Sequence, residues 1–391
     1  MAQRRETGSP EPAGHALDIG VVGGSIGGLF AAALLTRDGH RVSVLERSRR
    51  GLARRGAGLV AQQELFDLLD EVGREDAGRL GVVARERITL DRSGRVASRD
   101  PSPQTQLSWD HVYETFRALV PADRYLLDHA VASIEDPSSA GAATVELHDG
   151  RRLDFDLVVG ADGSGSVARE AVVPGATANR YVGYSTWRGL IPESALPADA
   201  ARTLLGRFAF YTAPGEHVLG YLVPGAGGEV EPGHRRYNWV WYRPLTPDAL
   251  RTVMVASGRP PSSVSLAPGE LEEDLRRDLA KAATLRLPPP FAEVVLAEPE
   301  PFLQAIVDFV PPRIVRGRAA LLGDAAVTVR PHTAMGAAKA AGDALALARV
   351  LARGEPVEAA LERYQAQRLP VGAAIAGYGQ RLGRSIPLVA A

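Results

Sequence analysis

The first regular pattern of the chain consists of two apolar runs with a helical pattern between them. Residues 18–22 and 41–46 are short and apolar, which is typical of buried strands. Residues 29–35 are rich in alanine and leucine, which favour a packed helix. Because glycines fill the turn at residues 23–28, the pattern predicts a strand, a tight turn, a helix and a second strand, the βαβ unit of a doubly wound sheet.

The rest of the chain mixes strand patterns with helical ones. Residues 87–99 read as a hairpin that turns at Ser93 and Gly94. Strand patterns broken by Gly and Pro turns fill residues 181–245, and aromatic residues concentrate there, which suits the wall of a pocket but also an ordinary hydrophobic core. Further strands are predicted at 143–147 and 153–159, and helical segments at 63–69, within 262–300 and within 319–366.

Length, charge and cysteine content narrow the classes of protein. The 391 residues suggest two domains, and a net charge of -1 gives no reason to expect nucleic acid or a membrane surface as partner. The absence of cysteine excludes disulfides and thiolate metal sites, and we expect no metal. No apolar run approaches the length of a membrane span, and residues 1–17 lack the apolar core of a secretion signal. We therefore expect a disordered tail at 1–17, a cytoplasmic location and a small-molecule substrate.

The glycine-rich turn at residues 23–28 carries the first candidate chemistry. Gly23, Ser25, Ile26 and Gly28 surround the start of the predicted helix, where backbone amides and the helix dipole favour a pyrophosphate. Glu46 ends the second strand, near the spacing at which an acidic residue accepts the ribose hydroxyls of a dinucleotide. Ser25 stands where the usual fingerprint has its second glycine, so a glycine-rich turn without any nucleotide stays an alternative.

A second strand pattern runs into an acidic turn at Asp162 and Gly163, followed by Ser166 and Arg169. These four residues resemble the D-G-x-x-S-x-x-R motif of the class A FAD-dependent aromatic hydroxylases, a family of flavoprotein monooxygenases. In that family the motif lies near both the flavin and the pyridine nucleotide. The resemblance therefore implies that the nucleotide at the first turn is FAD, bound tightly but without a covalent link.

A third strand pattern, at residues 319–322, runs into Gly323 and Asp324 and is similar to the G-D motif of the same family. The resemblance implies that Asp324 binds the ribityl chain of FAD. It also places Pro331 beside the flavin ring, and Gly336 and Ala337 at the start of the following helix, whose N-terminal dipole favours negative charge on the reduced flavin.

Three further residues are expected near the cofactor by the same resemblance: Arg47, Arg55 and Gly58. For Arg55 a solvated position on the surface is an equally open interpretation. The chain departs from the family pattern at Val327, where a histidine is usual. This departure, together with Gly24 and Ser25 and with residues 186–189, 330–332 and 338–340, resembles the dihydroxypyridine hydroxylase branch.

The resemblance also implies a reaction. NADH or NADPH, bound transiently, reduces FAD, O2 adds to the reduced flavin, and the flavin hydroperoxide hydroxylates an electron-rich aromatic or heteroaromatic ring. A base that deprotonates or polarises the substrate is expected, and a histidine has the most suitable pKa. The candidates are His332, next to Pro331, and then His217, Arg188 and Tyr211. A loop histidine that only shapes the pocket is an equally open interpretation of His332.

The fold that the resemblance implies is α/β. A Rossmann-like FAD-binding domain, of the para-hydroxybenzoate hydroxylase type, would be interleaved with a mainly antiparallel β-sheet substrate domain and followed by C-terminal helices. We expect residues 18–82, 108–180 and 301–391 to form the FAD-binding domain and residues 83–107 and 181–300 to form the substrate-binding domain. Assembly into a homodimer is left open.

Several alternative functions use the same fold. A flavin-dependent halogenase has a W-x-W-x-I-P motif, which residues 239–244 approach, but Arg243 replaces the isoleucine. A halogenase also needs a lysine in its first third, and no lysine precedes Lys281 here. An epoxidase, a decarboxylating hydroxylase, or a protein that binds flavin or an aromatic ligand without turning it over remain alternatives, because fold does not determine the substrate.

Overall fold

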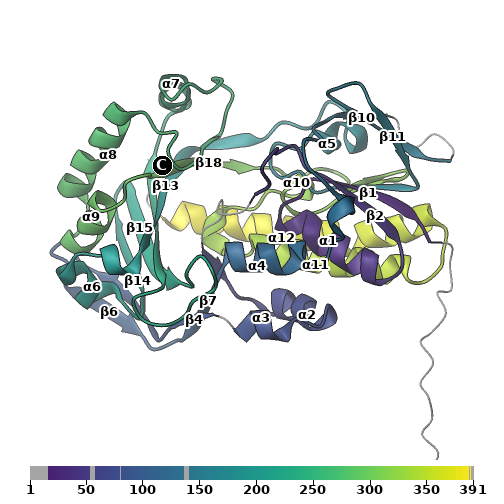
Figure 1. Ribbon diagram of the computed structural model, residues 1–391. Helices are drawn as coiled ribbons and strands as arrows, with labels where there is room; N and C mark the ends of the chain where they lie inside the picture. The colour runs from purple at the N-terminus through teal and green to yellow at the C-terminus, as the bar shows by residue number, and fades with distance from the viewer. Residues whose placement is uncertain (1–15, 53–57, 80, 136–140, 387, 389–391) are drawn as a thin grey trace, which may run out of the picture.

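The computed structural model describes residues 16–52, 58–79, 81–135, 141–386 and 388 (Figure 1). The predicted βαβ unit is present as β1 (Asp18–Val22), α1 (Ile26–Arg37) and β2 (Arg41–Leu45). These strands belong to a six-stranded sheet of order β19-β20-β12-β1-β2-β8. The sheet is parallel except for β19, and its other strands are β8 (Tyr125–Leu126), β12 (Leu157–Gly160), β19 (Val315–Arg316) and β20 (Ala319–Leu321).

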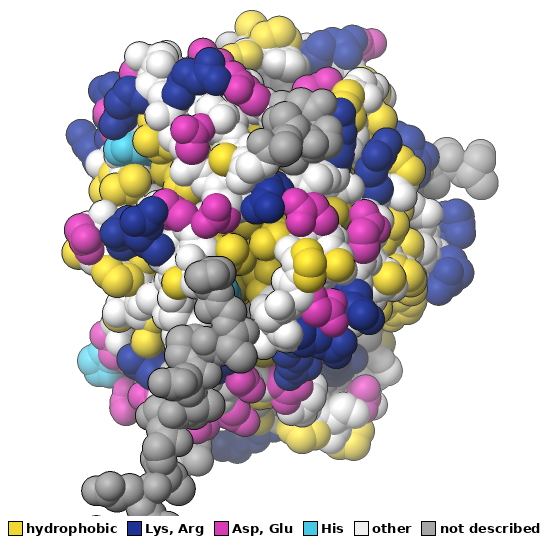
Figure 2. All heavy atoms as spheres, turned by 90° about the vertical axis from the view of Figure 1, so that its right-hand side faces the viewer, with side chains coloured by type: hydrophobic (Ala, Val, Ile, Leu, Met, Phe, Trp, Pro, Cys, Tyr) yellow, Lys and Arg dark blue, Asp and Glu magenta, His cyan; other side chains and the backbone are white. Residues whose placement is uncertain are grey.

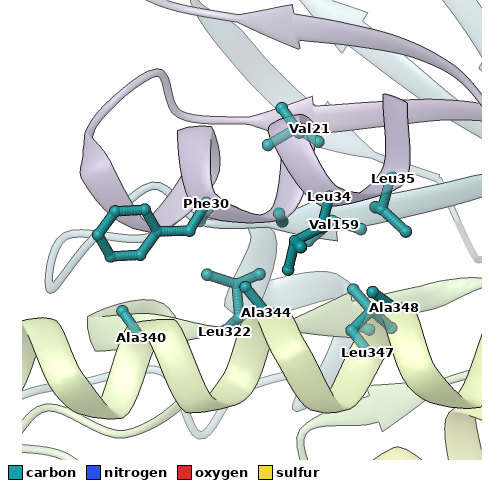
Figure 3. Close-up of a cluster of buried hydrophobic side chains, with 14 of the residues drawn as sticks. Val21, Phe30, Leu34, Leu35, Val159, Leu322, Ala340, Ala344, Leu347 and Ala348 are labelled. Carbon is teal, nitrogen blue, oxygen red and sulfur yellow. The ribbon is translucent and has the colours of Figure 1, made fainter. Parts of the chain in front are cut away.

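Helices cover the parallel sheet and form the larger hydrophobic core. In α1, Ala31 and Ala32 are fully buried, and such small side chains allow the helix to approach its neighbours closely. Figure 3 shows α1 above α11 (Gly336–Leu351), with Phe30 and Leu34 directed toward Ala340 and Ala344. Other helices on this side of the molecule are α2 (Gln63–Glu71), α3 (Glu75–Arg79), α4 (Trp109–Arg117), α5 (Ala168–Val172) and α10 (Gly323–Ala326).

The C-terminal helix α12 (Val357–Ser385) connects the two halves of the molecule. Leu361, near its start, is buried in the core of the parallel sheet. Leu388, just after its end, is buried against the second large sheet. The helix therefore runs past both sheets (Figure 1).

The second large sheet has eight strands in the order β17-β18-β13-β16-β15-β14-β5-β6, and it is antiparallel except for the β14–β5 pair. Its strands are β5 (Glu86–Leu90), β6 (Val96–Asp100), β13 (Arg180–Pro192), β14 (Arg207–Ala213), β15 (Glu216–Val223), β16 (Arg236–Pro244), β17 (Ser265–Leu266) and β18 (Phe302–Asp308). The predicted hairpin at 87–99 is thus β5 and β6. One face is covered by α6 (Ala198–Leu204), α7 (Pro247–Ala256), α8 (Glu273–Arg286) and α9 (Pro289–Leu296) (Figure 1).

Two three-stranded sheets complete the fold, with orders β3-β7-β4 and β11-β10-β9. Their strands are β3 (Gly58–Val60), β4 (Val82–Ala84), β7 (Gln104–Ser108), β9 (Val131–Ile134), β10 (Ala143–Leu147) and β11 (Arg152–Phe155). The strand predicted at 153–159 is therefore two strands, β11 and β12, which belong to different sheets. They separate at Asp156, whose amide donates to the Asp18 carbonyl at 2.8 Å.

The α/β fold with an interleaved antiparallel sheet and C-terminal helices is confirmed. Within the described residues, no helix combines the length and the apolar character that crossing a bilayer requires. The face shown in Figure 2 carries basic and acidic side chains interspersed with hydrophobic ones.

Candidate active site

The predicted cofactor motifs meet at one edge of the parallel sheet. Val22 at the end of β1 lies beside Leu45 of β2 and Gly160 of β12, and Gly160 lies beside Leu321 of β20. The turns that follow these strands carry Gly23, Glu46, Asp162 and Asp324 in turn. In open α/β sheets this carboxyl edge is where ligands bind.

The glycine turn after β1 is shaped for close approach of the backbone. A side chain at Gly23 would place its Cβ 2.6 Å from the Ala161 carbonyl oxygen, and one at Gly28 would overlap Gly23 itself. Ser25 is the N-cap of α1, and its hydroxyl makes no capping hydrogen bond. The amides of the first helical turn, which begins at Ile26, have no acceptor within the helix. They are therefore available to an anion such as a pyrophosphate.

Glu46 lies at the mouth of this turn and is only 4% exposed. Its carboxylate accepts hydrogen bonds from the amides of Gly24 at 2.9 Å and Ser48 at 2.7 Å. These bonds fix the carboxylate beside the turn and leave lone pairs for a hydroxyl donor. Arg47 follows as an exposed residue on the rim. Arg55 lies outside the described residues.

Asp162 organises the second motif. One carboxylate oxygen, Oδ2, accepts from the amides of Val167 at 2.7 Å and Ala168 at 3.2 Å. The other, Oδ1, is buried and has no partner among the described residues. Burial raises the pKa of this carboxyl. Around the neighbouring Gly163, a Cβ would meet no atom within 4 Å, so open space adjoins the turn.

Arg169, the last residue of the motif, connects the turn that follows Asp162 with the turn that carries Asp324. Its side chain is 1% exposed, and burial lowers its pKa to about 10. The guanidinium stacks on the ring of Phe309 at 3.6 Å. Its hydrogen bonds, 2.6–2.9 Å long, go to the carbonyls of Ser164, Asp324 and Ala325 and to the side chains of Asn179 and Thr328. Because its donors are used inside the protein, Arg169 is a structural residue here.

Asp324 combines exposure with a location inside the molecule. Its side chain is exposed, yet desolvation by the surrounding protein raises its pKa. This combination is typical of the wall of an internal channel. The preceding residue, Gly323, is held at both of its backbone groups: its amide donates to Asp343 at 3.0 Å and its carbonyl accepts from the Lys339 ammonium at 2.7 Å.

The buried cation beside Gly323 is part of a network at the start of α11. Lys339 pairs with Asp343 at 2.9 Å, and the two side chains are 1% and 3% exposed. Arg368 of α12 donates to the second oxygen of Asp343 at 2.7 Å. The network thereby fixes the backbone that presents Asp324. Lys339 was not among the predicted site residues, although it is one of two lysines in the whole chain.

The start of α11 also adjoins open space. A Cβ at Gly336 would meet no atom within 4 Å, and Gly336 and Ala337 are half-buried. Pro331, in the loop before the helix, is exposed. Gly58 of β3 approaches the second large sheet, since its Cβ would lie 2.5 Å from the Tyr221 ring. Free amides, acidic side chains and open space around these turns fit a dinucleotide such as FAD.

Next to Pro331, four rings form what we call the histidine–tyrosine cluster: Tyr184, His217, Tyr242 and His332. The Tyr242 ring lies 5.7 Å from the His332 ring and 5.5 Å from the His217 ring. The Tyr184 and His332 rings stack at 6.4 Å. The two predicted histidines are therefore brought together, although they come from β15 and from the loop before α11.

His332 has a defined tautomer. Its Nε2 lies 2.9 Å from the Gly379 carbonyl, which only accepts, so Nε2 carries the proton. Its Nδ1 is buried without a hydrogen-bond partner among the described residues. Burial lowers the pKa of His332. Burial and the nearby His332 also lower the pKa of His217, to about 4, and Nδ1 of His217 lies 2.8 Å from the Thr212 hydroxyl.

Alternation along the strands decides which of the other candidates reach the cluster. Arg188 lies on the same face of β13 as Tyr184, because residues two and four apart share a face. Tyr211 lies on the opposite face, in the core that the sheet shares with α6–α9. We therefore withdraw Tyr211 as a catalytic candidate. Trp239 and Trp241, the tryptophans of the halogenase-like motif, also belong to that opposite face.

An ion pair that the sequence did not point to supports the His332 loop. Arg330 donates to both oxygens of Asp308 at 2.8 and 2.7 Å and to the Tyr184 hydroxyl at 3.1 Å. Both charged side chains are under 10% exposed, at 9% and 6%. The alternation of side chains along β13 could have indicated which face Tyr184 lies on. Its hydrogen bond with Arg330, however, joins residues that are 146 apart in the sequence.

Two glycines of α12 allow this loop to lie against the helix. A Cβ at Gly379 would come within 2.9 Å of the Thr333 Cγ2 atom. A Cβ at Gly383 would lie 2.9 Å from the Tyr184 hydroxyl and would overlap the Arg330 guanidinium. The position of His332 therefore depends on the absence of side chains at these two positions.

Comparisons with known proteins identify the family of the chain. Three family models match the chain: an NAD(P)-binding Rossmann-like domain at residues 21–55, an FAD binding domain-like model at residues 181–308 and an FAD binding domain at residues 292–377. The 2,6-dihydroxypyridine 3-monooxygenase of Paenarthrobacter nicotinovorans is 32% identical over 90% of this chain and 87% of its own length. The 3-amino-4-hydroxybenzoate 2-monooxygenase of Streptomyces cremeus is 31% identical over 95% and 88%.

Solved structures show the same relationship. The structure of 2,6-dihydroxypyridine-3-hydroxylase from Arthrobacter nicotinovorans superimposes with a TM-score of 0.87 at 30% identity, over 97% of this chain and 94% of that one. Klebsiella pneumoniae HpxO, complexed with FAD and uric acid, superimposes with a TM-score of 0.74 at 25% identity, over 94% and 88%. The chain thus belongs to the class A FAD-dependent aromatic hydroxylases and is an FAD-dependent monooxygenase that uses NAD(P)H and O2.

Proposed function

We propose that this monooxygenase hydroxylates a hydroxylated aromatic or heteroaromatic ring held by the histidine–tyrosine cluster, with neutral His332 as the base. The observation that carries the proposal is the free Nδ1 of His332, which is buried beside Tyr184 and Tyr242 and has no partner among the described residues. Since Nε2 donates to Gly379, Nδ1 presents a lone pair that can accept a proton from a ring hydroxyl.

The protonation state of the cluster supports this role. Burial lowers the pKa of His332, so the imidazole is neutral near pH 7 and ready to accept. His217 lies across the Tyr242 ring and is also kept neutral. We propose that His217 orients the substrate while His332 exchanges the proton.

We also propose which residues hold FAD. The amides from Ile26 to Gly28 would bind the pyrophosphate, Glu46 the adenosine ribose and Asp324 the ribityl chain, and the amides of Gly336 and Ala337 would face the flavin ring. Bound there, FAD supplies the activation of O2 that no side chain can provide. The protein excludes water from the ring through the aromatic face of the second large sheet.

The division of the chain stays a proposal of the same kind. Residues 18–82, 108–180 and 301–391 would form the FAD-binding domain, and residues 83–107 and 181–300 the substrate-binding domain. The two large sheets support most of this division, because β5 and β6 join β13–β17 in one sheet. The boundary at 300 does not fit, because β18 (Phe302–Asp308) belongs to the same sheet. A homodimer and a cytoplasmic location also stay predictions, which light scattering and cell fractionation can check.

The names of the relatives suggest the first substrates to test. One relative is a 2,6-dihydroxypyridine 3-monooxygenase, another a 6-hydroxynicotinate 3-monooxygenase and a third a 3-hydroxybenzoate 6-hydroxylase. We propose hydroxypyridines and hydroxybenzoates as the substrate class. Their ring hydroxyls are the groups that a buried neutral imidazole can deprotonate.

The test is a screen of these compounds for NAD(P)H oxidation, with mass spectrometry of the products. We expect at least one compound to stimulate flavin reduction and to gain one oxygen atom. If no compound does either, hydroxypyridines and hydroxybenzoates are not the substrate class, and the proposal fails.

The same screen tests His332. His332→Ala should keep its FAD and lose most of the coupled hydroxylation, because general-base catalysis contributes about 10²–10⁴-fold. His234→Ala, at an exposed histidine, is the matched control and should behave like the unmodified protein. Equal coupling in the two variants would remove His332 from the mechanism.

A further inference from the structure

Arg188 places a positive charge within the face of the sheet that carries the histidine–tyrosine cluster. It lies in the middle of β13, opposite Phe302 of β18 and Val240 of β16. Its guanidinium lies 5.6 Å from the centre of the Phe302 ring. It is also close enough to Tyr221 and Tyr242 for its charge to oppose the rise that burial causes in the pKa of both phenols.

No group within the described residues neutralises this charge. Arg188 makes no hydrogen bond or ion pair in the part of the chain that the structure describes, and its buried Nε has no acceptor. Two other half-buried arginines, just before and at the start of β16, are paired with carboxylates. Arg235 bonds Glu193 at 2.6 Å and Arg236 bonds Asp110 at 2.9 Å. Arg188 therefore differs from Arg235 and Arg236 in lacking a carboxylate. Arg243 of β16 also makes no ion pair among the described residues, but it stacks on the Trp241 ring on the other face, where the charge of Glu216 acts on it.

A half-buried guanidinium without a counter-ion loses part of its hydration without an electrostatic gain. Its planar donors match the two oxygens of a carboxylate, or one ionised oxygen on a ring. We propose that Arg188 binds an anionic oxygen of the substrate, so that the substrate is an anionic aromatic compound. This inference rests on the proposed function. Arg188 then acts as a specificity-determining residue.

The spacing along β13 agrees with one ring held at both ends. Tyr184, which stacks on His332, and Arg188 are four residues apart, about 13 Å along a strand. With both side chains directed to the same face, a single substituted ring could span the distance between them. The hydroxyl to be deprotonated would face His332, and the anionic group would face Arg188.

The test compares binding of paired probes to the FAD-loaded protein, followed by changes in the flavin absorbance. The first pair is 6-hydroxynicotinate and 6-hydroxynicotinamide, in which an uncharged amide replaces the carboxylate. The second probe is 2,6-dihydroxypyridine, titrated across the pH range in which its ring oxygen ionises. The unmodified protein should prefer the anionic form of at least one probe by about 10–100-fold, as expected for hydrogen bonds to a charged group.

Arg188→Met should abolish this preference and keep normal FAD content and melting temperature. Arg188→Lys, which keeps the charge but not the planar donors, should restore it in part. The matched control is Arg243→Met, at an arginine stacked 4.5 Å from the Trp241 ring on the other face of the sheet, and it should keep the preference.

The two probes separate the sources of the anion. If Arg188→Met removes only the preference for 6-hydroxynicotinate over its amide, Arg188 binds a carboxylate. If the variant removes only the pH dependence of 2,6-dihydroxypyridine binding, Arg188 binds a ring oxyanion. A preference that survives Arg188→Met in both arms, or that is absent from the unmodified protein, overturns the proposal. Since binding is measured without turnover, a chain that binds the anion through Arg188 but forms no oxygenated product would refute the proposed function only.

Discussion

Lys339→Met is the sharpest test of how the flavin site is built, because it removes one charge and keeps the length of the side chain. The variant loses the ion pair with Asp343 at 2.9 Å and the hydrogen bond to the Gly323 carbonyl at 2.7 Å, both buried. Breaking a buried ion pair from one side costs about 3–5 kcal/mol. Asp343 keeps Arg368 at 2.7 Å, so we expect the lower end, about 3 kcal/mol.

The expected loss is measurable by thermal unfolding. At about 2 °C per kcal/mol for a large domain, Lys339→Met should melt about 6 °C below the unmodified protein. FAD affinity should fall as well, because the network fixes the backbone next to Asp324. Titration of the FAD-free protein with FAD, followed by quenching of flavin fluorescence, measures this second effect.

The chain offers a matched control in its only other lysine. Lys281→Met removes a side chain that is 73% exposed and pairs with Asp278 at 3.3 Å on the surface of α8. Such a surface pair contributes about 0–1 kcal/mol, so melting and FAD affinity should hardly change. If Lys339→Met melted at the same temperature as Lys281→Met and bound FAD as tightly, the network would not position the flavin site.

The remaining predictions concern the cofactor, the pH dependence and the His332 loop. Asp324→Ala should purify largely without FAD, and a normal ratio of flavin to protein absorbance would contradict its ribityl contact. Because burial lowers the pKa of His217 from 6.5 to about 4, the unfolded state binds the extra proton between these values. Stability to urea should therefore fall as the pH drops from 6.5 towards 4, less steeply in His217→Gln; equal slopes would refute the shift. Gly379→Ala should uncouple NAD(P)H oxidation from hydroxylation, whereas Gly377→Ala, whose Cβ meets only Arg381 at 3.5 Å, should not.

Local patterns were sufficient to predict the cofactor edge of the fold. The strand, glycine turn and helix at residues 18–37 depend on neighbours in sequence, and so do the turns that carry Asp162 and Gly323. The carboxyl ends of parallel strands meet at one edge, so three separate motifs could be assigned to one cofactor. Within the described residues, the predicted FAD contacts lie at or near that edge.

Elements that depend on distant contacts were harder to predict. The apolar run at 153–159 reads as one strand, but Asp156 exchanges hydrogen bonds with Asp18, 138 residues away, and this contact divides it. Tyr211 and Phe210 show the same limit within one strand. A shift of one residue moves a side chain to the other face, and the register of β14 was not readable from its composition.

The role of Arg169 also depended on the structure. Its motif lies near the flavin and the pyridine nucleotide in the family, whereas its donors bind the backbone of the Asp324 turn. Likewise, the pairing of Arg330 with Asp308 and Tyr184 joins segments that no spacing rule connects. Charged residues that support the site from behind, such as Arg169 and Arg330, were therefore harder to predict from the sequence than those expected to face the cofactor.

The glycines of α12 have a consequence for changing the specificity of this enzyme in the laboratory. Gly379 and Gly383 contact the loop of His332 from outside the histidine–tyrosine cluster. Small substitutions there would move the base relative to a bound ring and leave every residue that faces the ring unchanged. A directed-evolution library confined to the pocket lining would miss these positions, while one that includes α12 would sample the angle at which the ring meets the flavin.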